Sequence, residues 1–124
     1  FTIKQVKQNE NQERTEFEDK MCEQYRQTIS PLPVEVFFGI ELQPEKMNEH
    51  MKDFFRYFDL TNEQITMHNK KLIRKETWDE WLKGIQWTMR LPAFAASWKH
   101  IKEKVPDCFH ELRVLENSDF AQCS

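Results

Sequence analysis

Residues 47–58 read Met-Asn-Glu-His-Met-Lys-Asp-Phe-Phe-Arg-Tyr-Phe. Side chains spaced three or four residues apart lie on one face of an α-helix, and a large apolar face of this kind is normally buried against other elements. Pro44 stands just upstream, where a proline is favoured as a first helical residue. The stretch therefore predicts a strongly amphipathic helix. Its apolar face is made by Met47, Met51, Phe54, Phe55 and Phe58.

The same periodicity continues towards the C-terminus and predicts further helices. Thr61 is expected to cap a helix that ends before Arg74 and Lys75. The prolines at positions 92 and 106 are expected to start the next two helices. The expected apolar faces hold Ile65 and Leu72, then Trp78, Trp81, Leu82, Ile85 and Met89, then Phe94, Trp98, Ile101 and Val105, and finally Phe109, Leu112 and Leu115. We expect Trp78, Trp81 and Trp98 to lie in the core.

Residues 1–29 lack proline and glycine and are rich in good helix formers, so they predict one long helix. Residues 7–16 are polar throughout, whereas apolar residues recur every fourth position from Phe17 to Ile29. Only the second half has a face to bury, and the polar part is expected to be a solvated stalk. One interpretation of residues 1–29 is the stalk after a missing transmembrane helix. The closely spaced prolines Pro31 and Pro33 end this helix, and residues 30–124 form a helical globular domain.

The predicted fold class is all-α, an array of five to six helices with a long N-terminal helix. No stretch alternates apolar and polar residues long enough for a convincing strand, and hairpin dipeptides are absent. The short apolar segment 34–42 is consistent with a helical turn or two or with an extended run, and we favour the helical interpretation.

Composition excludes several functions. The chain has 124 residues, of which 39% are hydrophobic, and its ten Phe and four Trp can fill a compact core. Two glycines leave no glycine-rich phosphate loop. A net charge of −3 argues against a nucleic-acid-binding domain with an overall basic field.

The cysteines and histidines form no recognisable catalytic or metal motif. Cys22, Cys108 and Cys123 are odd in number and far apart, which indicates neither a disulfide framework nor a zinc site. Cys108 and His110 face away from each other on a helix. No cofactor and no metal are therefore expected, and the chain is not expected to be an enzyme. The alternative is a small soluble helical enzyme or ligand-binding domain that uses His100, His110 or Cys108.

The sharpest charged feature is a basic cluster, which we define as Lys70, Lys71, Arg74 and Lys75. Residues 66–104 carry nine basic and four acidic side chains, although the whole chain is acidic. Such a cluster could contact anionic lipid headgroups or an acidic partner. A solvated helical face is the simpler explanation.

Two stretches resemble a family of small bacterial proteins of unknown function that have an N-terminal transmembrane helix and a cytoplasmic helical domain. Residues 1–9 look like the end of the membrane helix and the basic run after it. Residues 54–112 are similar in the order of their features, although Ala93 stands where the family often has glycine. These features are Phe54-Phe55 with Tyr57-Phe58, Leu72-Ile73, Trp78-Asp79-Glu80-Trp81, Leu91-Pro92-Ala93-Phe94, Trp98, and Pro106 before Phe109.

The resemblance implies a domain tethered to the cytoplasmic side of the inner membrane. Lys4 and Lys7 follow the apolar Phe1, Ile3 and Val6, and positive charge beside a membrane helix favours the cytoplasmic side. The expected function is contact with a protein partner or self-association. If no tether is present, the chain is expected to be cytoplasmic.

Overall fold

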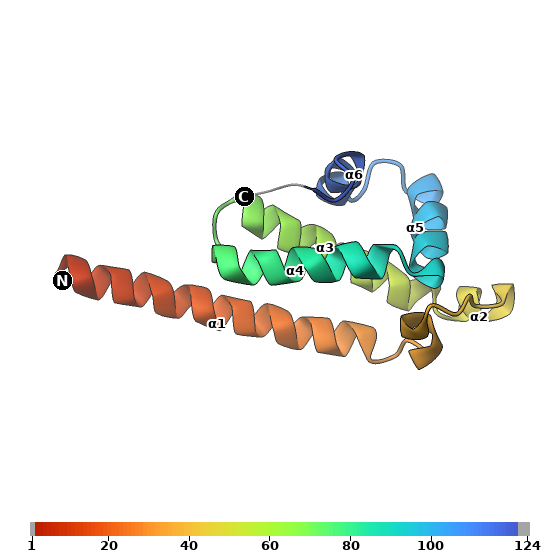
Figure 1. Cartoon of the computed structure of the whole chain (residues 1–124), viewed down its shortest axis with the longest axis horizontal. Helices are drawn as coiled ribbons and strands as arrows, with labels where there is room; N and C mark the ends of the chain where they lie inside the picture. Colours follow the sequence, from red (N-terminus) through yellow and green to blue (C-terminus); the bar gives the residue numbers. More distant parts are fainter. Residues whose placement is uncertain (1, 122–124) are drawn as a thin grey trace.

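The computed structural model describes residues 2–121 and is all-helical, as predicted (Figure 1). The described residues contain no strand. The elements are α1 (Ile3–Ile29), the 3-10 helix η1 (Val34–Phe38), α2 (Pro44–Glu49), α3 (Met51–Asn69), α4 (Lys75–Met89), α5 (Pro92–Lys104) and α6 (His110–Asn117).

Helix α3 is the centre of the molecule, because α1, α5 and α6 all pack against it. Its aromatic face meets Phe94 of α5, whose ring centroid lies 5.1 Å from that of Phe54 and 5.0 Å from that of Tyr57. Both pairs are edge-to-face, the arrangement that aromatic quadrupoles favour. Phe54 and Phe58 of the predicted face are buried and Met47 and Met51 partly buried, whereas Phe55 is 39% exposed. The face is also divided between two helices.

The division falls at His50, which the sequence analysis did not predict. His50 ends α2 and precedes α3, with φ −104° and ψ 7°. Its Nδ1 lies 3.0 Å from the Asp53 carboxylate in the first turn of α3. The apolar spacing continues across this bend, so the pattern alone could not locate it.

The predicted helix start at Thr61 is wrong. Helix α3 runs through this position to Asn69, and Thr61 is 1% exposed in its interior. No proline or glycine interrupts residues 51–69, and α3 is held by packing on several sides. Thr61 instead hydrogen-bonds the buried Tyr57.

The predicted start of the last helix at Pro106 is also wrong, because α6 begins at His110. Phe109 precedes it in the left-handed region, at φ 62°, with its ring buried. Arg113 stabilises this turn by donating to the carbonyl oxygens of Val105, at 2.9 Å, and Cys108, at 2.7 Å. The guanidinium thus reaches the carbonyls of Lys102 and Val105 at the end of α5 and that of Cys108 in the turn.

Three other boundaries lie close to the predicted ones, but the helix expected to include Leu72 ends at Asn69, and Leu72 is 45% exposed. Helix α1 ends at Ile29, α4 starts directly after Arg74, and Pro92 is the first residue of α5. Trp78 and Trp98 are buried as expected, whereas Trp81 is only partly buried.

Helix α1 has two halves with different surroundings. Residues 2–16 are exposed throughout, and burial begins at Phe17, Glu18 and Met21. In Figure 1 the N-terminal part of α1 extends past the neighbouring ends of α3 and α4. We call residues 3–16 the arm.

Candidate functional site

The carboxylate of Glu18 joins α1 to the beginning of α4. Glu18 is 3% exposed. Its oxygens accept from the backbone N–H of Arg74 at 2.9 Å, from Nη2 of Arg74 at 2.6 Å and from the Thr77 hydroxyl at 2.7 Å. Arg74 is the N-cap of α4, so a negative charge lies where the helix dipole favours one. We call this arrangement the clasp.

The clasp keeps Glu18 ionised. Burial alone would raise the pKa of its carboxyl group, but hydrogen bonds from the Arg74 side chain, the Arg74 backbone and Thr77 outweigh burial and lower the pKa below its ordinary value. The Arg74 side chain is half-exposed, so its guanidinium spans from this site to the surface.

The clasp changes how the predicted basic cluster is built. Lys70, Lys71 and Lys75 are exposed around the connection from α3 to α4, with Lys71 at φ 62°. Arg74 belongs to the same connection, but Glu18 pairs with it. The cluster therefore presents three exposed lysines, and whether they bind an anion stays a prediction.

The residues of the alternative enzymatic hypothesis lie apart. His100 is exposed on α5, Cys108 is exposed in the turn after α5, and His110 is exposed at the start of α6. None of them lines the cavity described below. Among residues 2–121, no three His, Cys, Asp or Glu side chains are placed to hold a metal ion. Cys123 lies outside the described residues.

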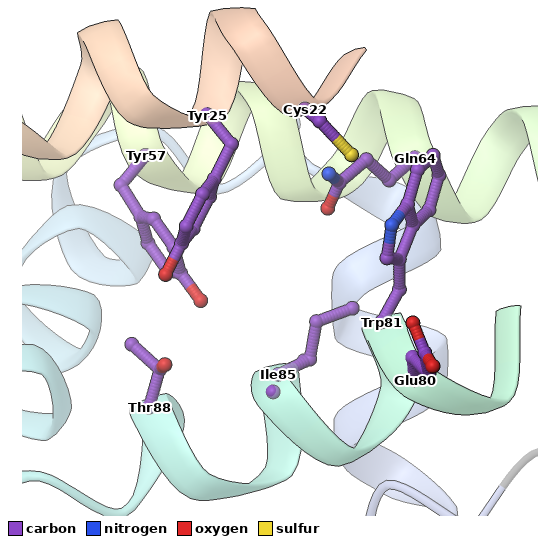
Figure 2. A pocket seen from close by; sticks show the side chains of 9 residues that line it. Cys22, Tyr25, Tyr57, Gln64, Glu80, Trp81, Ile85 and Thr88 are labelled. Atoms are coloured by element: carbon purple, nitrogen blue, oxygen red, sulfur yellow. The ribbon is translucent and has the colours of Figure 1, made fainter. Parts of the chain in front are cut away.

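A cavity of about 300 Å³ opens between α1, α3 and α4 (Figure 2). Tyr25 and Trp81 form opposite parts of its wall, and the sulfur of Cys22 points inward from α1. The complete lining is Cys22, Tyr25, Tyr57, Gln64, Glu80, Trp81, Gly84, Ile85 and Thr88.

Polar side chains form part of the wall of this cavity. Tyr57 is buried and hydrogen-bonds Thr88 and Thr61, and the net effect of burial is a raised pKa of its phenol. Burial also raises the pKa of Tyr25. Gln64 is 6% exposed, and its side-chain amide points into the cavity.

Gln64 and Gly84 were not predicted as cavity residues, although each is an unexpected residue type at its position in the sequence. Gln64 lies among the buried positions of α3, between Thr61 and Ile65, where an apolar residue is expected. Gly84 interrupts a helix of good helix formers, and an interior helical glycine often has a packing or functional reason. Neither signal reveals that α1 closes over both residues.

A second unusual group lies near the end of α3. The His68 ring stacks on Trp78, with centroids 3.9 Å apart and planes 7° from parallel. Burial lowers the pKa of His68, and Asp79 opposes this effect only in part. The indole N–H of Trp78 is buried without a hydrogen-bond partner among residues 2–121.

Exposed apolar side chains gather in the segment after α1. Val34 is 55% exposed, Phe38 71% and Ile40 50%. In Figure 1, η1 and α2 lie at the end of the long axis opposite the N-terminus. We call Val34, Phe38 and Ile40 the apolar tip.

Fold and site together define a small all-helical domain with a projecting helical arm. Comparisons with protein-family models, with curated proteins and with solved structures found no match. Within residues 2–121, every helix is too short or too polar to cross a membrane.

Proposed function

We propose that this chain is a non-enzymatic protein-interaction domain, tethered by its arm to the cytoplasmic side of a membrane. The observation that carries the proposal is the exposure of every residue of the arm, whereas the same helix is docked from Phe17 onwards. Glu10, Glu13 and Arg14 line a shallow cavity with Leu72, but none of the arm residues is buried. A mostly solvated helix of this kind suits a spacer between two attached parts.

The charge pattern of the arm supports the direction of the tether. Lys4 and Lys7 lie beside Ile3 and Val6, and lysines next to an apolar membrane segment favour the cytoplasmic side. The polar residues 7–16 would hold the domain about 15 Å from such a segment, at 1.5 Å per residue. A short isolated helix is only marginally stable in water, so an arm continued by a membrane helix would be better ordered.

The arm itself is a poor surface for self-association. In a coiled coil, residues seven positions apart lie in the same seam. Seven positions after Ile3 and Val6, the arm has Glu10 and Glu13. A parallel pair of arms would bring these glutamates together in the seam, where apolar residues are required. A protein partner on the domain is therefore favoured over a second copy along α1.

The apolar tip is the surface we assign to that partner. It lies far from the arm along the length of the molecule, so a tether at the N-terminus would leave it accessible from the cytoplasm. Its three side chains are large and exposed, and residues of this kind mark contact surfaces when they cluster.

Cell fractionation tests the tether. The complete gene product that contains this chain is expressed, and the membrane and soluble pools are separated. We expect recovery in the membrane pool, with release by detergent and not by high salt. The triple variant Lys70→Ala/Lys71→Ala/Lys75→Ala is the matched control and should fractionate identically. Recovery in the soluble pool would overturn the tether, and release by salt together with loss in the triple variant would assign attachment to the lysines.

A further inference from the structure

The cavity between α1, α3 and α4 exists because two of its lining residues are small. Gly84 has no side chain, and a Cβ added there would meet no other atom within 4 Å. Cys22 contributes only a thiol on the opposite side, from α1. Larger side chains at these positions would occupy part of this space, so the two small residues keep the cavity open.

The walls define which molecule fits. Three aromatic rings, those of Tyr25, Tyr57 and Trp81, surround the space. Aromatic rings bind other rings by edge and face contacts and attract cations through their π faces. An aromatic ligand would therefore match most of this lining.

The polar groups of the lining determine how a ligand would be oriented and which charge it can carry. The Gln64 side-chain amide points into the cavity and offers it both a donor and an acceptor. Glu80 contributes a carboxylate, and the lining contains no lysine, arginine or histidine. An anionic ligand would find no positive partner and would meet Glu80, so the lining favours neutral or positively charged molecules.

We propose that this cavity binds a small aromatic molecule that is neutral or cationic, with its ring among Tyr25, Tyr57 and Trp81 and a hydrogen-bonding group on Gln64. The volume of about 300 Å³ is at the lower end for ligand pockets, which suits a single-ring or two-ring compound. The inference goes beyond the tethering function and does not depend on where the protein is located.

A ligand in this position would touch α1 and α4 at the same time. The clasp ties these helices near Glu18, and the cavity separates them further along, at Cys22 and Tyr25. Binding would therefore strengthen the docking of α1 on the domain. Through α1, occupancy of the cavity would stabilise the base of the arm.

Three matched probes test the chemistry: 2-phenylethylamine, 2-phenylethanol and phenylacetate share one ring and differ in charge. Binding is measured by titration of the Gln64 side-chain amide signal in NMR spectra. We expect the amine and the alcohol to shift this signal, and phenylacetate to bind at least about tenfold more weakly. Equal binding of all three, or no shift by any probe at millimolar concentration, would overturn the proposal.

Two variants at Gly84 test the location. Gly84→Leu should fill the cavity and abolish binding of 2-phenylethylamine, whereas Gly84→Ala should retain it. Melting temperatures of both variants establish that they are folded, and Ile85→Ala, which enlarges the cavity, should not abolish binding. Unchanged binding by a folded Gly84→Leu would place the probe elsewhere and overturn the assignment.

Cys22 gives an independent readout in a Cys108→Ser/Cys123→Ser background, where it is the remaining thiol. Its modification by a thiol reagent should slow when 2-phenylethylamine is present. An unchanged rate at a concentration that saturates the NMR signal would contradict binding beside Cys22.

Discussion

Glu18 lies on the buried face of α1, yet it is ionised and holds two helices together. Its carboxylate accepts from the backbone N–H and the guanidinium of Arg74 and from the Thr77 hydroxyl. A carboxylate in this position is tolerated because its hydrogen bonds replace those it loses to water. Removing the negative charge leaves the donors in place with a weaker acceptor.

We expect Glu18→Gln to lower the free energy of unfolding by about 1–3 kcal/mol at neutral pH. Because the folded-state pKa of Glu18 is lowered from 4.5, its contribution is complete above that value and is lost as the pH falls through the lowered pKa. Thermal unfolding of both proteins at about pH 7 and about pH 3 should show the difference shrinking with acid. A difference that grows in acid would contradict the ionised clasp.

His68 also makes the stability of the protein depend on pH. Its pKa is lowered from 6.5 in the folded protein, mainly by burial, so it also makes the protein less stable as the pH falls, but over a higher range. Both the wild type and Glu18→Gln contain His68, so its effect cancels in the difference between them.

Trp98 belongs to α5, and its ring contacts residues of α3 and α6. Its ring is 5.1 Å from that of Phe58, and its indole N–H donates to Glu116 at 2.7 Å. Trp98→Ala should lower the free energy of unfolding by about 3–5 kcal/mol. The control Trp87→Ala removes a 54% exposed ring and should change it by about 0.5 kcal/mol or less. Chemical denaturation measures both, and similar small losses would contradict the packing of Trp98.

At the scale of elements, one residue of helix α4 lowers the stability of that helix. Gly84 lies in its interior, where glycine is about 1 kcal/mol less favourable than alanine, and its Cβ position is open. Gly84→Ala should therefore raise the free energy of unfolding by about 1 kcal/mol, measured by denaturation. A loss of stability would mean that the helix requires glycine here.

The arm should contribute little to the stability of the domain. Removal of residues 1–14 deletes only exposed positions among those described and leaves Phe17, Glu18 and Met21 in place. We expect a melting temperature within about 2 °C of the full chain, measured by circular dichroism. A larger fall would show that the arm makes stabilising contacts.

The elements also show what the sequence could and could not predict. Periodicity predicted the all-helical class, and Pro92 and the 31–33 turn located helix boundaries correctly. The starts expected at Thr61 and Pro106 were wrong, because tertiary contacts decide those positions. The bend at His50 and the turn before α6 were missed, because Asp53 and Arg113 stabilise them through side-chain contacts. The cavity was missed because it depends on how α1 docks against α3 and α4, which no local pattern describes.

At the scale of the whole molecule, the arm and the apolar tip lie at opposite ends. A photo-crosslinking residue at position 38, in cells that express the complete gene product, should give a discrete crosslinked species. The same residue at exposed Lys99 on α5 is the control and should not give this species. Identical crosslinking at both positions would contradict a partner surface at the apolar tip.

The clasp joins residues that are 56 positions apart in the chain, and this separation matters while the protein is being made. At about 5–20 residues per second, Glu18 would leave the ribosome about 3–11 s before Arg74. During this interval Glu18 has no partner from α4 and the cavity face of α1 is uncovered. The charged and amide-rich composition of α1 suits a helix whose docking face stays in contact with water during this interval.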